Sequence, residues 1–296
     1  ETDKSDKGLY QGTDDYGTTY YYRGNVKNNI VKFAGFYWQI IRINGDGTIR
    51  LLYNGTEKNA SGVKQSINNK TYQFNSKYND PTYVGYMYGN PDGTTFDEVH
   101  TNTTSSTIKT AVDNWYKANI ADKGYSSYIS NAVGFCGDRS LPAGVWGTND
   151  NGDGVNNTPR TSYFGAYVRY VKNVAQFTCP EPSRDLYTTT DSSIGNKVLT
   201  YPVGLITYDE LVFAGMDNRH INKLSWAYST QHYWTMSPSH FDAANGRAYG
   251  WYLYGAGSLT LTWVTNGLGA RPVINLKSDT LITGGIGTGS DPFVVG

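Results

Sequence analysis

The stretch that decides the fold class is VKFAGFYWQIIRINGDGTIRLLYNG, residues 31–55. It contains two runs rich in aromatic and aliphatic residues, 38–43 and 48–53, separated by Asn44-Gly45-Asp46-Gly47. Gly and Asn accept the positive φ angles of tight turns, whereas aromatic and β-branched side chains favour strands. The stretch therefore predicts a β-hairpin, and YYYRGNV at residues 20–26 predicts another strand before it.

The composition of the chain favours an all-β or strand-rich protein, and the two helices described next make the predicted fold class α+β. Gly (34) and Tyr (26) are abundant among the 296 residues, as expected for short strands joined by tight turns. Hydrophobic residues make up 38%, which is enough for a core. The 25 Lys and Arg balance the 25 Asp and Glu, so no net field attracts nucleic acid or an anionic membrane.

Two helices and long ordered loops are expected between the strands. A helical period of apolar residues begins after Ser105, and TYDELVFAG contains a capping box, Thr207 and Glu210, with Gly215 as a stop. Residues 134–200 are rich in Gly, Asn, Thr and Pro and predict long ordered loops. The apolar positions of the first helix are Ile108, Ala111, Val112, Trp115 and Ile120.

The domain prediction is a polar N-terminal arm, residues 1–19, followed by a single domain, residues 20–296. The chain begins with Glu1 rather than Met, which indicates a removed leader and therefore export. No run of about 18 apolar residues occurs, so we expect no membrane insertion by this segment. Cys136 and Cys179 predict a disulfide, with two buried free thiols as the alternative.

Seven pieces in one order resemble a family of bacterial proteins of unknown function with a C-type-lectin-like fold, also found in the formylglycine-generating enzyme. The resemblance spans about residues 20–295 and implies secreted or cell-surface proteins of gut-dwelling Gram-positive bacteria and their wall-less relatives. The same fold displays the variable region of diversity-generating retroelement proteins near the C-terminus. The pieces are YYYRGNV, VKFAGFYWQIIRINGDGTIRLLY, AVDNWYKANI, YFGAYVR, YPVGLITYDELVFAG, YWTMSPS and GARPVINLKSD.

The region about 228–277 is the expected binding face. Residues 234–263 contain three Trp and three Tyr but only two charged side chains, and Tyr and Trp beside Ser, Thr and Asn are typical of recognition surfaces. The alternative is that these aromatic residues belong to the core, which we expect for Trp234. The candidate ligand-binding residues are His240, Phe241, Asp242, Asn245, Arg247, Tyr249, Trp251, Tyr254, Ser258, Thr260, Thr262 and Trp263.

Most motifs that would support catalysis or metal binding are absent. Asn149, Asn151 and Asp153 resemble the opening of a calcium loop, but the closing Glu is missing, so a turn is favoured over calcium binding. The glycan-binding Glu-Pro-Asn and Gln-Pro-Asp signatures of C-type lectins do not occur. No Cys follows Cys179, whereas the oxidase relatives need a reactive pair in that part. The four His are scattered without zinc-site spacing and predict surface or loop positions.

The sequence therefore predicts an extracellular or cell-surface binding module without catalysis or a cofactor, whose ligand is a protein or a glycan. One alternative is a structural surface or pilus-tip subunit whose aromatic face packs on a neighbouring subunit. Another is a glycan-processing enzyme, which requires two carboxyl groups about 5 to 9.5 Å apart.

Overall fold

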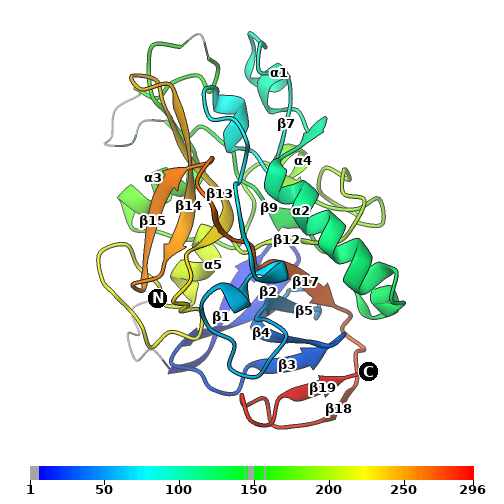
Figure 1. Cartoon of the computed structure of the whole chain (residues 1–296). Helices are drawn as coiled ribbons and strands as arrows, with labels where there is room; N and C mark the ends of the chain where they lie inside the picture. The colour runs from blue at the N-terminus through cyan, green and yellow to red at the C-terminus, as the bar shows by residue number, and fades with distance from the viewer. Residues whose placement is uncertain (1–6, 144, 146–149, 157) are drawn as a thin grey trace.

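The computed structural model describes residues 7–143, 145, 150–156 and 158–296, and shows an α+β protein built on two main sheets (Figure 1). The larger sheet has the order β12-β17-β5-β4-β3-β19-β18, with β2 pairing to β4 and β1 to β2. Its strands are β1 (Lys7–Asp14), β2 (Gly17–Gly24), β3 (Ile30–Phe33), β4 (Phe36–Ile43), β5 (Ile49–Tyr53), β12 (Gly204–Leu205), β17 (Pro272–Leu276), β18 (Ile282–Gly284) and β19 (Phe293–Val295).

The second sheet is formed mainly by the C-terminal half of the chain and has the order β15-β14-β13-β16-β6, with β10 pairing to β13. Its strands are β6 (Thr71–Tyr72), β10 (Ser162–Tyr163), β13 (Tyr233–Asp242), β14 (Arg247–Tyr254), β15 (Ser258–Trp263) and β16 (Leu268–Gly269). Two small pairs complete the strands: β7 (Met87–Tyr88) with β8 (Thr104–Ser105), and β9 (Phe135–Cys136) with β11 (Leu186–Tyr187).

The hairpin predicted from residues 31–55 is confirmed as β4 and β5, which lie in the middle of the larger sheet. Trp38 pairs with Tyr53 across the hairpin, and both side chains are buried. The Trp38 indole N–H donates to the carbonyl of Phe33, which satisfies its polar atom inside the core. One hydrophobic cluster joins this hairpin to the second sheet, as the membership of both Trp38 and Trp234 shows.

Both predicted helices are confirmed. The first is α2 (Thr107–Tyr116), whose N-cap Ser106 accepts from the backbone N–H of Lys109 and which continues into a π-helical turn, Lys117–Ala121. The second is α5 (Tyr208–Phe213), with the predicted capping box of Thr207 and Glu210. The described residues also contain α1 (Phe96–His100), α3 (Gly165–Lys172) and α4 (Pro182–Asp185), so the prediction of two helices was too low.

The polar N-terminal arm is a wrong prediction for residues 7–19, because β1 and the start of β2 lie there. The two strands pair along their full length, from the Lys7 and Gly24 pair to the Asp14 and Gly17 pair. Asp14 is buried and forms an ion pair with Arg42 of β4, which explains why a strand forms from so polar a sequence. A buried carboxylate needs a counter-charge.

The predicted long loops at residues 134–200 contain more regular structure than expected, namely β9, β10, α3, α4 and β11. Cys136 of β9 and Cys179 form the predicted disulfide, with a Cα–Cα distance of 5.6 Å and a sequence separation of 43. The loop that it closes contains all of α3. None of the helices within the described ranges has the length and apolar character needed to cross a membrane.

Candidate functional site

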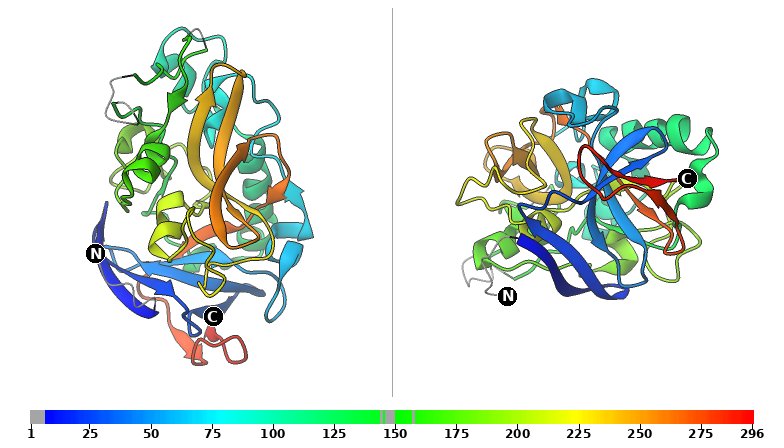
Figure 2. Two further views of the ribbon diagram at one scale, coloured as in Figure 1. Left: turned by 90° about the vertical axis from the view of Figure 1, so that its left-hand side faces the viewer. Right: turned by 90° about the horizontal axis from the view of Figure 1, so that it is seen from below.

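A groove runs between α3 and the edge of the second sheet, and we call it the α3–β15 groove. It consists of two adjoining hollows of about 370 and 690 Å³, which share Tyr170 and Asn218 in their walls. The left view of Figure 2 shows α3, the β14–β15 hairpin and the yellow loop near residue 220 on one face of the molecule. The walls are formed by α3, α5, residues 215–222 and the hairpin.

The position of α3 is fixed by a buried ion-pair fork. The Arg169 guanidinium donates to both carboxylate oxygens of Asp209, at 2.7 Å each, and to Asp138 at 2.6 Å. Attraction to these carboxylates outweighs the effect of burial and raises the pKa of Arg169 further above its ordinary value. Tyr167 and Tyr170 are three residues apart and share one face of this helix, so the fork also fixes two walls of the groove.

The smaller hollow is lined by Trp251 of β14. Its ring lies 4.5 Å from the ring of Tyr208, 5.2 Å from Tyr170 and 6.1 Å from Tyr167, measured between centroids. The Trp251 side chain is buried, and its indole Nε1–H has no hydrogen-bond partner among the described residues. Buried donors are nearly always paired, so this N–H is a polar group for which the fold supplies no acceptor.

The rim of the groove carries exposed apolar side chains. Val174, Ile221 and Tyr254 line the groove and are 53%, 65% and 42% exposed. Leu224, 65% exposed, belongs to the same connecting segment as Ile221. Exposed apolar side chains gathered around one hollow are typical of a binding site, whereas single ones scattered over a surface are not informative.

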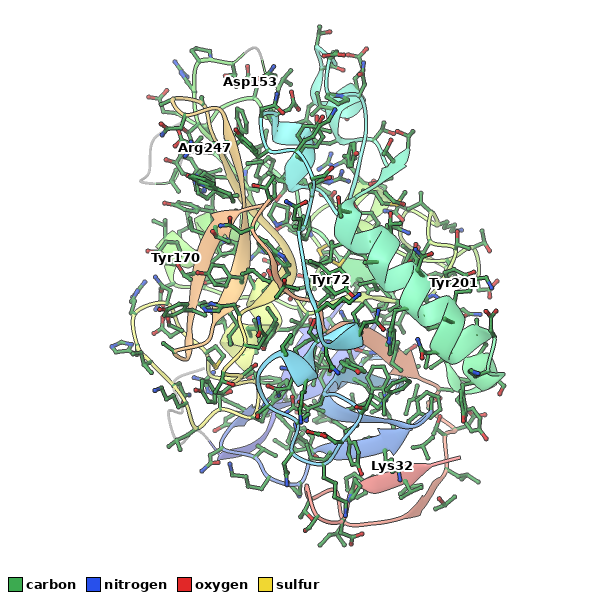
Figure 3. All side chains as sticks on the ribbon, in the orientation of Figure 1. Lys32, Tyr72, Asp153, Tyr170, Tyr201 and Arg247 are labelled. Atoms are coloured by element: carbon green, nitrogen blue, oxygen red, sulfur yellow. A yellow bond between two sulfur atoms is a disulfide. The ribbon has the colours of Figure 1, made fainter. Side chains whose placement is uncertain are left out.

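A second aromatic cluster lies further along the same side of the sheet, towards Arg247 (Figure 3). His240 stacks on Tyr249 with centroids 4.3 Å apart, and it also contacts Tyr163 and Tyr167. The Arg247 guanidinium lies 3.8 Å from the centre of the Trp263 ring. Tyr167 contacts both His240 and Trp251, so the cluster continues the wall of the groove.

Comparison of the chain with family models, with curated proteins and with solved structures finds no match. The residues of the groove therefore carry the chemical inference. Among the described residues that line it, Asp217 is the only carboxylate, while Asn218, Ser258, Thr260 and several tyrosines offer neutral hydrogen-bonding groups. Arg23, Arg219 and His220 also line the larger hollow, whereas the described lining of the smaller hollow has no charged side chain and suits a ligand that combines apolar surface with uncharged polar groups.

The predicted contact residues do not form one surface. Cross-strand partners share a face of a sheet and neighbours in a strand alternate, so the register divides the predicted set in two. Asn245 lies in the turn between β13 and β14 and donates to Asp242. On the α3 side are His240, Asp242, Arg247, Tyr249, Trp251 and Trp263; on the opposite side are Phe241, Tyr254, Ser258, Thr260 and Thr262.

Two of the predicted contact residues are corrected by their burial. Phe241 and Trp251 are 2% and 1% exposed and belong to the hydrophobic core, so neither is an exposed contact. Trp251 is buried because α3 and α5 cover its face of the sheet, which strand alternation alone does not reveal. Trp234 is fully buried, as predicted. Tyr254, Ser258 and Thr260 lie on the opposite face from Trp251, but they are at the hairpin end and the outer edge of the sheet, where they line the groove together with Trp251.

The candidate calcium residues have other surroundings. Asn149 lies outside the described residues. The Asn151 side chain donates to the carbonyls of Pro142 and Tyr163 and accepts from the N–H of Tyr163 at 2.7 Å, so it fixes β10 next to α3. Asp153 is exposed. No group of three or more His, Cys, Asp or Glu within the described ranges is arranged to hold a metal ion.

One histidine prediction is wrong, because His100 is completely buried rather than at the surface. Its ring packs 4.3 Å from the ring of Phe96 and contacts Phe164. Its Nε2 lies 3.0 Å from the carbonyl oxygen of Gly154, and burial lowers its pKa well below the ordinary value. This histidine therefore stabilises the fold in its neutral form.

The sequence prediction missed Tyr167, Tyr170, Val174 and Ile221, which form much of the groove. A weak signal existed in YFGAYVRY, where tyrosines three or four residues apart indicate one helix face. The eight-residue helix has no side-chain N-cap, so its start is not marked in the sequence.

His240 is expected to titrate near pH 4, because burial among aromatic rings lowers its pKa from 6.5 to about 4. In the unfolded chain the pKa of its ring should be about 6.5. The pKa of His240 is therefore lower in the folded protein than in the unfolded chain, so the unfolded chain takes up the proton first. The free energy of unfolding should fall as pH falls from about 6.5 towards 4. NMR titration of the ring in water and in urea measures both values, and a folded pKa of about 6 or higher would contradict the account.

Proposed function

We propose that this protein is an exported bacterial ligand-binding module, with a C-type-lectin-like fold, that binds a protein or glycan through the α3–β15 groove. The observation that carries the proposal is the set of exposed apolar side chains, Val174, Ile221 and Tyr254, around a hollow with aromatic walls. Apolar surface in a hollow, with a few polar groups to orient the ligand, is the usual composition of a binding site.

The family resemblance supports the extracellular location that we propose. The resemblance also implies that the C-terminal region carries the contact residues, and Tyr254, Ser258 and Thr260 of this region line the groove. Tyr167 and Tyr170 of α3 extend the proposed contact surface beyond that region.

The arrangement of carboxylates favours binding over glycan processing. A glycosidase needs two carboxyl groups on either side of a sugar. Asp138, Asp209 and Glu210 come together at a separate internal cavity of about 20 Å³, where each is paired with an arginine. A space of this size accommodates about one water molecule and no sugar ring.

The test is binding of the labelled protein to an array of glycans and host surface proteins, once with calcium and once with chelator. We expect specific hits for the wild-type protein and a loss of at least about tenfold in affinity for Tyr254→Ala, because exposed tyrosines at a contact often contribute more than 1 kcal/mol. Tyr20→Ala is the matched control, since Tyr20 is also 42% exposed but lies on β2.

Equal binding by the wild-type protein and Tyr254→Ala would place the contact elsewhere, and an array without hits would count against the proposed function. The two calcium conditions report whether a metal takes part in binding. Sedimentation of the protein alone at increasing concentration tests the structural-subunit alternative, for which assembly of the free protein is the expected result.

A further inference from the structure

The outer strand of the second sheet, β15, lacks the usual protection of a sheet edge. Among the described strands it pairs only with β14, over six residues in a register without a bulge. Its sequence, Ser-Leu-Thr-Leu-Thr-Trp, contains no charge and no proline. Exposed edges normally carry charged residues, prolines or bulges, because an unprotected edge pairs with other strands.

The register shows which backbone groups of β15 point outward. The Val264 N–H donates to the carbonyl of Ala248. Every second residue pair from there, Thr262 with Gly250 and Thr260 with Tyr252, therefore exchanges hydrogen bonds between β15 and β14. Leu261 and Trp263 occupy the alternate positions, and their N–H groups point away from β14. Neither amide has an acceptor in the described part of the chain, and both residues are partly exposed.

The chain itself already pairs with the other end of this edge. The Leu259 N–H donates to the carbonyl of Asp217 at 2.8 Å, and the Asn222 N–H donates to the carbonyl of Gly257 at 2.8 Å. Extended backbone therefore fits beside β15, and the pairing stops at Leu259. Beyond Leu259 the edge is open, and Leu259 and Leu261 also line the smaller hollow of the α3–β15 groove.

We infer that the partner of this groove is an extended polypeptide segment that adds to β15 as a further strand, starting beside Leu261. This inference rests on the proposed function and specifies the ligand as a protein rather than a glycan. The main chain of the segment pairs with the outward N–H and carbonyl of Leu261 and accepts from the Trp263 N–H, since the Trp263 carbonyl already accepts from the N–H of Asn266. One of its uncharged side chains enters the hollow lined by Trp251. Strand addition combines main-chain hydrogen bonds with pockets for alternate side chains.

The test uses a random library of 12-residue peptides displayed on phage and selected on the wild-type protein. Selected peptides are synthesised, and their affinities are measured by fluorescence anisotropy for the wild type, Leu261→Pro and Leu261→Ala. Proline removes an outward N–H without removing a hydrogen bond to β14, whereas alanine shortens the side chain and keeps the N–H. We expect affinity to fall at least tenfold for Leu261→Pro and less than threefold for Leu261→Ala.

N-methylation of each peptide amide in turn provides a readout that does not depend on the folding of Leu261→Pro. Strand addition predicts that affinity falls at every second position. No selected peptides, no alternation, or equal binding by the proline variant would overturn the inference. Peptides that lose affinity for Tyr254→Ala but show no alternation would leave the groove as a binding site and reject strand addition. Dimers that exclude the peptide would show that the edge pairs with a second copy, which also contradicts the inference.

Discussion

Replacement of Glu210 by alanine is expected to lower the free energy of unfolding by about 3–5 kcal/mol, because it leaves the buried Arg50 guanidinium without its counter-charge and leaves Arg42 with Asp14 alone. The carboxylate lies 2.5 Å from the Nε of Arg50 and 3.3 Å from the Nε of Arg42, and all three side chains are at most 6% exposed. Glu210 also accepts from the N–H of Thr207 in the capping box of α5. Its removal therefore weakens both a helix start and a charge network.

The pKa of Glu210 reflects the same ion pairs and the same hydrogen bond. Burial alone would raise it, but attraction to Arg50 and Arg42 and the hydrogen bond from Thr207 outweigh burial and lower it. A carboxyl group with a lowered folded pKa contributes stability above its unfolded pKa, and this contribution is lost as pH falls through the folded pKa. The difference between the wild type and Glu210→Ala should therefore be largest near neutral pH and should shrink in acid.

Urea unfolding followed by circular dichroism measures this difference. The matched control is Glu57→Ala, since Glu57 forms an ion pair with Lys64 at 2.7 Å in which both side chains are more than half exposed. Exposed pairs of this kind contribute about 0–1 kcal/mol. A loss below about 1 kcal/mol for Glu210→Ala would show that the buried network does not stabilise the fold in the way described.

Removal of the disulfide is expected to lower the free energy of unfolding by about 4 kcal/mol, the chain-entropy value for a closed loop of this length. The cysteines are 43 residues apart, and the segment between them contains β10 and α3. The unfolded chain gains freedom when the bond is absent, while α3 loses one of the restraints that hold it beside the sheet. The walls formed by Tyr167 and Tyr170 should therefore become more mobile as well.

The measurement is urea unfolding of the wild-type protein and of the double variant Cys136→Ala and Cys179→Ala, each with and without reductant. Reductant should lower the urea concentration at the unfolding midpoint of the wild type and leave the midpoint of the double variant unchanged. Hydrogen exchange across residues 165–172 reports the effect on α3. A wild-type midpoint that does not respond to reductant under conditions that fully reduce the bond would contradict this prediction.

The elements that the sequence predicted well are those with a complete local signal. The β4–β5 hairpin has two strand-forming runs around Asn44-Gly45-Asp46-Gly47, and α5 has a capping box at its start and Gly215 after its end. By contrast, β1 is polar and depends on pairing with β2 and on the contact between Asp14 and Arg42. Interactions between distant residues cannot be obtained from a local pattern.

The candidate site was predicted only in part for the same reason. Aromatic content located the β13–β15 region, but the sequence could not show which face of the sheet α3 and α5 cover. That cover buries Trp251 and leaves Tyr254 exposed, although both lie on β14. The walls formed by α3 come from residues about 80 positions earlier in the chain, and Arg169 holds them in place through two distant carboxylates.

The measurement that tests the central claim most directly is hydrogen–deuterium exchange of the protein, alone and saturated with the strongest ligand from the array. If the α3–β15 groove binds the ligand, exchange should slow in residues 165–175, 215–222 and 254–263 and stay unchanged in β1 and β2. Protection confined to other segments, with these three unchanged, would show that the groove is not the binding site.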